Sequence, residues 1–531
     1  MSTKFILLGI FLLALVLRTM NLGDLPHGFF EEEVTNAYVG RFILQNGKDL
    51  YGNMFPLLYF DKFHDYPPVL PMYISGLGTF LFGNTEFAAR FPIASIGALT
   101  IYPVFGLALI LLGNASAALF ASFLLAILPW HIVLSRTGAE GVVGLFVYIL
   151  AINWIFREKL RWAIVAFFLT YFLYPSFRIL VPLTVLPLIL LVGKSYRKTI
   201  AIAGIGFVLF TAIVSMTVWG RGRFEQTSVF KSTEIRDRVV FLNTYFSNDE
   251  GTDQVRLARM FHNKGIGYAR EIAKQYMSYF SPSHLFYEAD GQPRYFNVPQ
   301  NGLLYMTMAL LFLAALIPIG KSIRPGYIAY VVYLLIIAPI PAVLTIDFVP
   351  HAHRSIMMIL PLVLIAAYGY LSLRSLIPQY RVLPILLVFL LTLELIYFWH
   401  GYDRHSASYQ SVLRNDGDKE VARYVLAHEN EYERVVMPMF ARLPVYYAYF
   451  SGNYSASLAG QFRNEIKIDR IGKVEFFTDW CPTKYLKPEE ITTNTLIVDG
   501  GDCPGQVGYQ EIDSFVRRDG TRAYKLLIMK E

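Results

Sequence analysis

Charged residues are scarce in this 531-residue chain, where Asp, Glu, Lys and Arg together make up 16%, against about 25% in ordinary soluble domains. The hydrophobic share is 55%, and the mean hydropathy is +0.42. This balance excludes an ordinary soluble enzyme of this length. The net charge of +7 is what the flanks of membrane segments supply, so nucleic acid is not expected as a partner.

Cysteine is also scarce, and the only two, Cys481 and Cys503, both lie after Trp399. An extracytoplasmic location would permit a disulfide between them. Two buried thiols are the alternative, and the spacing along the chain does not decide between them without geometry. The sequence shows no internal repeat and no low-complexity tract.

What the chain does contain is a series of about twelve apolar runs that approach or reach the roughly 20 residues needed to cross the membrane as helix. Strands facing lipid would leave backbone groups unsatisfied, so the runs are expected to be helices. We predict a polytopic α-helical membrane protein with eleven to thirteen spans, the first being a retained signal anchor. The runs cover residues 5–17, 70–82, 92–112, 115–133, 142–156, 162–174, 179–192, 200–219, 303–319, 327–346, 356–373 and 382–399.

Short loops rich in Lys and Arg mark the cytoplasmic side of a membrane protein, and residues 157–161, 194–198 and 321–324 are such loops. Alternation of the helices between these loops then places the long segment 221–300 and everything after Trp399 outside. Counting from the N-terminus, with Lys4 inside, places the acids near residue 32 outside as well. The two counts disagree by one crossing between residues 67 and 135. One run there is therefore expected to be short, re-entrant or merged.

Two domains are predicted from the change in hydropathy near residue 400. Residues 1–400 form the membrane domain, with an external catalytic loop at 21–67 and an ordered external lid at 221–300. Residues 401–531 form a small soluble extracytoplasmic α/β domain. The secondary structure expected in these loops and domains is a helix at 267–279, a helix at 416–426, strands at 434–437 and 495–498, and a hairpin at 509–528.

Three consecutive carboxylates, Glu31, Glu32 and Glu33, follow the first apolar run. Acids beside hydrocarbon are costly, so their presence suggests a functional site. The alternative is that they begin a helix, where carboxylates complement the helix dipole. The two interpretations are compatible.

The stretch PHGFFEEEVTNAYVGRFILQNGKDLYGNMFPLLYFDKFHDYPP resembles bacterial and archaeal members of the protein mannosyltransferase and aminoarabinose transferase group, glycosyltransferase family 39 with the GT-C membrane fold. Those proteins carry an Asp-Glu pair, then a G-Y-N-A pattern, Y-G-N-x-x-P and D-Y-K-P-P. The resemblance puts Glu32 on the catalytic Asp and Glu33 on the Glu. It departs after Asp65 and Tyr66, where Pro67 stands in place of the family's Lys.

The resemblance extends over most of the first 400 residues, through Pro129-Trp130-His131, Glu140, Tyr174, Arg178 and His353-Arg354. It implies transfer of a hexose or pentose from a polyprenyl-phosphate donor to a hydroxyl of a glycan, lipid or protein acceptor, with inversion, on the extracytoplasmic face. Such transfer needs a base to deprotonate the acceptor and cations for the departing phosphate.

Glu32 is our candidate base, assisted by Glu33 and Glu140. For Glu140 the plain alternative is an ion pair with Arg136, four residues earlier. For Arg178 and Arg354 the alternative is snorkelling to lipid headgroups. The candidate substrate-binding residues are Asp65, Tyr66, Arg136, Tyr174, Arg178, His262, Lys264, His353 and Arg354.

A divalent metal such as Mg²⁺ or Mn²⁺, held by Glu32 and Glu140, stays open because carboxylates are its usual ligands. No zinc-like ligand set accompanies His351 and His353. The rival function is a transporter or lipid flippase with an acidic and arginine-lined path, which predicts inverted repeats or paired broken helices. An oligosaccharyltransferase would carry a Trp-Trp-Asp signature, which the chain lacks.

Overall fold

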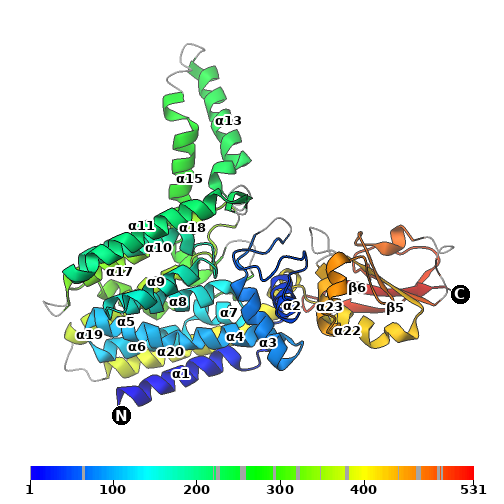
Figure 1. Cartoon of the computed structure of the whole chain (residues 1–531), viewed down its shortest axis with the longest axis horizontal. Helices are drawn as coiled ribbons and strands as arrows, with labels where there is room; N and C mark the ends of the chain where they lie inside the picture. The colour runs from blue at the N-terminus through cyan, green and yellow to red at the C-terminus, as the bar shows by residue number, and fades with distance from the viewer. Residues whose placement is uncertain are drawn as a thin grey trace.

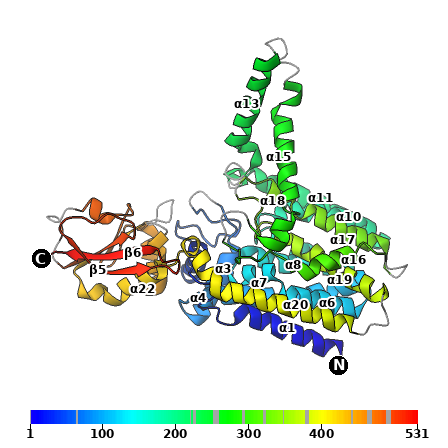
Figure 2. The same ribbon diagram turned by 180° about the vertical axis from the view of Figure 1, so that it is seen from behind.

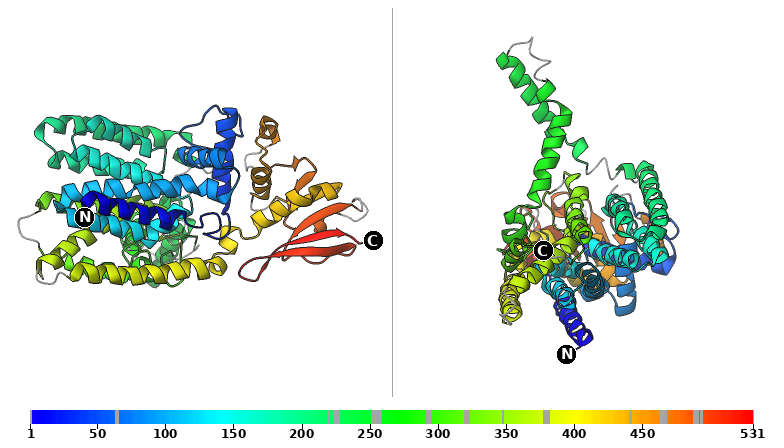
Figure 3. Two further views of the ribbon diagram at one scale, coloured as in Figure 1. Left: turned by 90° about the horizontal axis from the view of Figure 1, so that it is seen from below. Right: turned by 90° about the vertical axis from the view of Figure 1, so that its left-hand side faces the viewer.

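The computed structural model describes residues 2–62, 66–218, 220–222, 228–250, 259–290, 295–318, 323–346, 348–376, 382–439, 442–461, 468–486, 491 and 494–530. Most helices lie side by side in one bundle, and a sheet domain lies beyond one end of it (Figures 1 and 3). The predicted fold class, a multi-pass helical membrane protein with a C-terminal α/β region, is confirmed.

The bundle's helices have the following bounds: α1 (Thr3–Thr19), α3 (Leu70–Phe82), α4 (Glu86–Leu99), α5 (Ile101–Leu112), α6 (Ala115–Ile127), α7 (Pro129–Arg136), α8 (Glu140–Phe156), α9 (Leu160–Thr170), α10 (Phe177–Leu191), α11 (Lys194–Met216), α16 (Met306–Ala314), α17 (Pro325–Ile337), α18 (Ile340–Val343), α19 (Ile359–Leu376) and α20 (Leu383–His400).

Five helical segments within the described ranges are long and apolar enough to cross a membrane. They are Glu86–Leu112, Lys194–Met216, Pro325–Val343, Ile356–Leu376 and Leu383–Tyr409. Helices α6 and α7 make a sixth if counted together. The other apolar helices are shorter, so the finer count of eleven to thirteen spans stays a prediction.

The α6–α7 pair bends by 51° at Leu128, the residue before Pro129. Proline disfavours helical backbone at the residue that precedes it and suits the first turn of a new helix. The bend lies within residues 67–135, where the distribution of Lys and Arg predicts an irregular run.

Helix α2 (Glu31–Asn46) begins with the three acids and packs on α3. A Cβ at Gly40 would lie 1.8 Å from the carbonyl oxygen of Met72, and one at Gly76 would lie 2.3 Å from the carbonyl carbon of Gly40. Only glycine permits this backbone contact. The pair of glycines therefore sets where α2, and its acids, lie against the bundle.

An arm of two helices, α13 (Thr233–Glu250) and α15 (Lys264–Ser278), projects from the side of the bundle (Figures 1 and 2). The sequence predicts α15 but not α13. The stretch 276–286, expected to be part of a lid, packs into the bundle at the base of the arm, where Tyr279 and Leu285 are buried in its core.

The C-terminal domain contains a six-stranded mixed sheet with the order β2-β3-β1-β4-β6-β5. Strand β1 is parallel to β3 and β4, and the other pairings are antiparallel. Its elements are α21 (Ser406–Tyr409), α22 (Asp418–His428), β1 (Arg434–Pro438), α23 (Leu443–Ser451), β2 (Arg470–Ile471), β3 (Val474–Phe477), β4 (Thr495–Gly500), β5 (Tyr509–Val516) and β6 (Arg522–Met529). The predicted helix, strands and hairpin are all present, with small changes at their ends.

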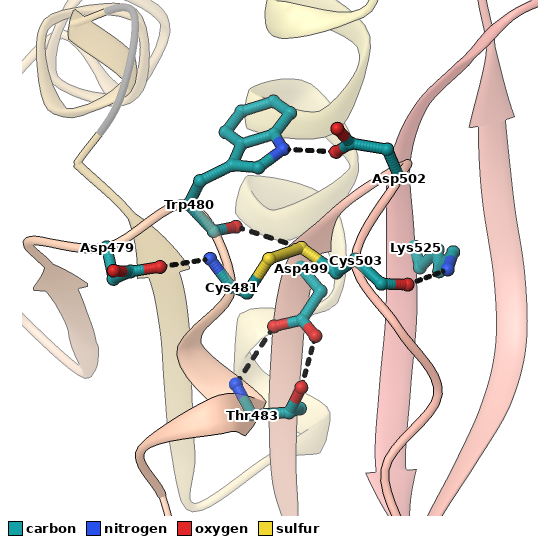
Figure 4. The surroundings of a disulfide bond; sticks show 8 residues. All are labelled: Asp479, Trp480, Cys481, Thr483, Asp499, Asp502, Cys503 and Lys525. Atoms are coloured by element: carbon teal, nitrogen blue, oxygen red, sulfur yellow. Dashed lines mark hydrogen bonds between the residues drawn. A yellow bond between two sulfur atoms is a disulfide. The ribbon is translucent and has the colours of Figure 1, made fainter.

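Cys481 and Cys503 form a disulfide, which decides the open choice between a bridge and two thiols (Figure 4). It joins the loop after β3 to the loop after β4. Nearby, Asp499 accepts a hydrogen bond from the Thr483 amide at 3.0 Å, and Trp480 Nε1 donates to Asp502 at 2.5 Å.

The main hydrophobic cluster of the C-terminal domain continues into α2 and α3, while a smaller cluster lies within the domain itself. Helix α2 and α23 share one hydrophobic cluster, which includes Phe29, Tyr38, Met72, Tyr446 and Tyr449. The Tyr446 hydroxyl donates to the Phe29 carbonyl, and Tyr38 donates to the Asn453 carbonyl at 3.0 Å. The start of α2, which carries the acids, is therefore held between the bundle and the C-terminal domain.

Candidate active site

A cavity of about 290 Å³ opens where the N-termini of α2 and α8 meet the loops that precede α10 and α19. Six of the predicted site residues line it: Glu32, Glu33, Glu140, Tyr174, His353 and Arg354. The remaining lining residues are Phe30, Glu31, Asn36, Lys62, Pro67, Pro68, Thr137, Gly138, Ala139, Pro175, Tyr295, Phe296, Phe348 and His351.

Glu32 keeps access to the cavity, since its side chain is 39% exposed. Its Oε2 forms an ion pair with Lys62 Nζ, and its Oε1 lies 3.7 Å from Arg442 Nη1. The first-turn position also places it at the positive end of the α2 dipole. These positive groups complement the negative charge of the carboxylate.

Glu33 has a different environment, because its side chain is only 4% exposed and its oxygens are occupied. Oε2 lies 2.9 Å from Arg90 Nη2 and accepts from the Phe30 amide at 3.0 Å. Arg414 Nη2 donates to both oxygens, at 3.1 and 3.2 Å. Arg90 in turn donates to the backbone carbonyls of Leu22, Pro26 and Gly28, in the segment that precedes α2. Glu33 therefore fastens the loop to the bundle and to the C-terminal region.

Glu140 begins α8 and accepts a hydrogen bond from Asn36 Nδ2 at 3.1 Å. His353 Nε2 lies 3.7 Å from Glu140 Oε2 and accepts from the Gly141 amide at 3.0 Å. A nitrogen that accepts carries no proton, so this histidine is neutral. Burial lowers the pKa of His353. The charge of Arg354 lowers this pKa as well, whereas the charge of Glu140 raises it.

The alternative ion pair between Arg136 and Glu140 is not formed. The two residues lie on different helices, and the Arg136 Nη atoms donate to the carbonyls of Leu17, Met20 and Leu25 at 2.7–2.9 Å. Arg136 is buried and outside the cavity lining. Its role in the structure is to fix the chain that leaves α1.

Arg354 enters the cavity from the loop before α19, and its Nη1 donates to Thr345 Oγ1 at 2.8 Å. This loop is anchored by a buried carboxylate, Asp290, which accepts from the Ala352 amide at 2.5 Å. Burial raises the pKa of Asp290 to about 8. Trp130 Nε1 donates to the Ala352 carbonyl at 2.9 Å, so the loop is held from two sides.

The other predicted site residues are not brought into this cavity. Arg178 is on α10 and is absent from the cavity lining, as is Tyr66, although the adjacent Pro67 lines it. His262 and Lys264 lie on the projecting arm. Asp65 lies outside the described residues.

Residues 9–139 match the family of dolichyl-phosphate-mannose-protein mannosyltransferases. The matched part runs from within α1 to the loop after α7 and includes the three acids. The predicted recognition and the enzyme class, a membrane glycosyltransferase, are confirmed. No curated protein sequence matches the chain.

The glycosyltransferase fold also matches a solved structure over nearly the whole chain. ArnT from Cupriavidus metallidurans bound to undecaprenyl phosphate is 14% identical, with a TM-score of 0.52, and the match covers 99% of this chain and 98% of that one. ArnT from the same organism in the apo state is also 14% identical, with a TM-score of 0.41, 99% of this chain and 97% of that one being covered. At this identity the first match shows a shared fold.

Three polar residues that contact the acids of this transferase were not predicted from the sequence. Asn36 could have been found, because it lies four residues after Glu32 on the same helix face. Lys62 supplies a cation close to the motif in which the family's Lys is replaced by Pro67. Arg442 had no local signal, since it comes from the C-terminal domain.

The divalent metal remains untested by the geometry. Within the described ranges, no three His, Cys, Asp or Glu side chains are grouped as metal ligands. Glu32 instead has Lys62 and Arg442 as neighbours, and Glu140 has Asn36 and His353.

Proposed function

We propose that this glycosyltransferase moves a sugar from a polyprenyl-phosphate donor to an acceptor hydroxyl, with inversion, at the extracytoplasmic face. One observation carries the proposal: a half-exposed carboxylate, Glu32, and two cations, Lys62 and Arg354, line the same cavity. A carboxylate suits proton removal. Lysine and arginine suit a phosphate leaving group.

Glu32 is the best base among the acids of this cavity. The oxygens of Glu33 are occupied by two arginines and a backbone amide, so it cannot take a proton without breaking a buried ion pair. Glu140 is supported by Asn36 and lies beside a neutral His353, which suits the binding of acceptor hydroxyls.

In the proposed step, Glu32 takes the proton of the acceptor hydroxyl while the oxygen of that hydroxyl attacks the anomeric carbon of the donor sugar. The bond between that carbon and the phosphate oxygen breaks, and the polyprenyl phosphate leaves with both electrons of the bond. Lys62 and Arg354 stabilise the phosphate as its charge grows. A single displacement of this kind inverts the anomeric carbon.

The carrier lipid is supported by the family match and by the fold. The family's printed description names dolichyl-phosphate mannose, and the ArnT structure with the shared fold holds undecaprenyl phosphate. Both are polyprenyl phosphates. A transporter is less well supported, because the described part of the chain contains one bent helix pair rather than two in corresponding positions.

Two features support an extracytoplasmic site. The Cys481–Cys503 disulfide fits an oxidising compartment, and the Lys/Arg-rich segment 157–161 follows the end of α8 that is opposite Glu140. In this orientation the C-terminal domain completes the site, because Arg442 and Arg414 reach Glu32 and Glu33 from it.

The test uses purified full-length protein, a radiolabelled polyprenyl-phosphate mannose or pentose, and candidate glycan, lipid and peptide acceptors. We expect transfer by the wild type and a loss of about 10²–10⁴-fold in the Glu32→Gln variant, the usual contribution of a general base. Glu31→Gln is the matched control on the same helical turn. Unchanged transfer by Glu32→Gln would exclude the mechanism.

A further inference from the structure

We propose that a second cavity, at the end of α8 remote from the active site, binds the headgroup of a membrane phospholipid. This cavity measures about 280 Å³ and lies between the α4–α5 junction and α8. It is lined by Leu99, Tyr102, Pro103, Phe146, Leu150, Asn153, Trp154 and Arg157.

The first observation is a buried hydrogen-bond acceptor without a donor. Asn153 is 3% exposed, and its Nδ2 donates to the Pro103 carbonyl, which fixes the direction of the side-chain amide. Its Oδ1 has no hydrogen-bond partner among the residues that the structure describes. Buried polar atoms are nearly always satisfied. The occupant of the cavity should therefore offer an N–H or O–H group.

The second observation is a cation at the mouth of the same cavity. Arg157 follows the last residue of α8, one helical turn beyond Asn153, and it is exposed. A Cβ at Gly106 would lie 2.8 Å from Arg157 Nη2 and 3.0 Å from Asn153 Oδ1. Because Gly106 has no side chain, the Arg157 guanidinium and the Asn153 amide oxygen can both lie next to its Cα.

The third observation is the position of the cavity in the membrane. Arg157 lies 17 residues after Glu140, which is about 25 Å along an α-helix and close to the roughly 30 Å thickness of the hydrocarbon. Tyr102 and Trp154 flank the polar end, as aromatic residues do at membrane interfaces. Leu99, Phe146 and Leu150 provide an apolar wall for a lipid tail.

Together these groups specify the chemistry of the occupant. Arg157 would bind the phosphate of the lipid, and Asn153 Oδ1 would accept from the ammonium of an ethanolamine headgroup or a hydroxyl of a glycerol headgroup. A choline headgroup offers no such donor. The site is separate from the active site, so its failure would leave the proposed transferase function untouched.

The test is native mass spectrometry of the full-length protein with phosphatidylethanolamine, phosphatidylglycerol and phosphatidylcholine in equal amounts. We expect retention of one ethanolamine or glycerol lipid in preference to the choline lipid. Arg157→Gln should weaken retention of every phospholipid about tenfold or more, as the loss of a charged hydrogen bond does. Asn153→Leu should abolish the preference between headgroups.

Arg161→Gln is the matched control, because it removes a nearby arginine at the start of α9 that does not line the cavity. An equal loss in this control, or equal retention of all three phospholipids by the wild type, would overturn the proposal. If Asn153→Leu does not fold, Leu150→Trp fills the apolar wall and leaves both polar groups in place. Lost retention in that variant supports the site, and unchanged retention overturns it.

Discussion

Two adjacent glutamates should differ in what the same substitution changes, because Glu32 faces the cavity and Glu33 is buried between arginines. Replacing Glu33 should lower stability, whereas replacing Glu32 should lower transferase activity. In Glu33→Gln, the guanidinium groups of Arg90 and Arg414 lose the carboxylate that balances them. These arginine side chains are 0% and 2% exposed. Breaking a buried ion pair by removing one partner costs about 3–5 kcal/mol. We therefore expect Glu33→Gln to lower the free energy of unfolding by that amount.

The first assay is denaturant-induced unfolding of the purified protein in detergent. A second assay is limited proteolysis, which detects exposure of the chain near residue 414. Glu33→Gln should unfold at lower denaturant and expose the junction with the C-terminal domain. Glu31→Gln is the control, since its carboxylate is 29% exposed and 3.7 Å from Arg442. Exposed pairs of this kind are worth about 0–1 kcal/mol. Glu32→Gln should likewise keep its stability while losing transferase activity.

The reasoning fails if Glu33→Gln is as stable as Glu31→Gln, since the buried pair would then contribute nothing. It also fails if Glu32→Gln is as unstable as Glu33→Gln, because a loss of activity could then reflect misfolding.

Four further outcomes are expected from the same contacts. Arg442→Gln should lower kcat/KM and move the pH profile of kcat/KM, whereas Arg442→Lys should restore part of the activity; an unchanged profile would argue against a positioning role. Burial raises the pKa of Asp290 to about 8, so this side chain binds its proton more tightly in the folded protein than in the unfolded one. The free energy of unfolding should therefore fall as the pH rises from about 4 to 8. Asp290→Asn should flatten this slope when unfolding is measured as a function of pH. Gly40→Val should lower both stability and transfer, because its side chain would collide with the Met72 carbonyl; normal activity would refute the backbone contact. Reducing the Cys481–Cys503 disulfide should lower the free energy of unfolding of the wild type by about 2–4 kcal/mol in denaturant titrations. The stability of the Cys481→Ser variant should not change when reductant is added.

The architecture of this transferase could be predicted largely from local patterns. Long apolar runs can satisfy their backbone in lipid only as helices, and the alternating strands after residue 430 require no knowledge of distant contacts. The acids at 31–33 were recognisable both as the start of a helix and as part of a family motif. What local patterns missed was the helix α13, whose apolar content is too low to mark it as a membrane segment.

The chemical roles of individual side chains were decided only by the tertiary structure. Glu32 and Glu33 are neighbours in sequence, yet one faces the cavity and the other meets Arg414, which is 381 residues away. Arg136 carries the right charge for a phosphate site but turns to the carbonyls near Met20. Which way a side chain points depends on how each helix is rotated and on partners far along the chain. The amino-acid sequence alone therefore determines which kinds of groups are present, whereas packing determines which of them share the cavity.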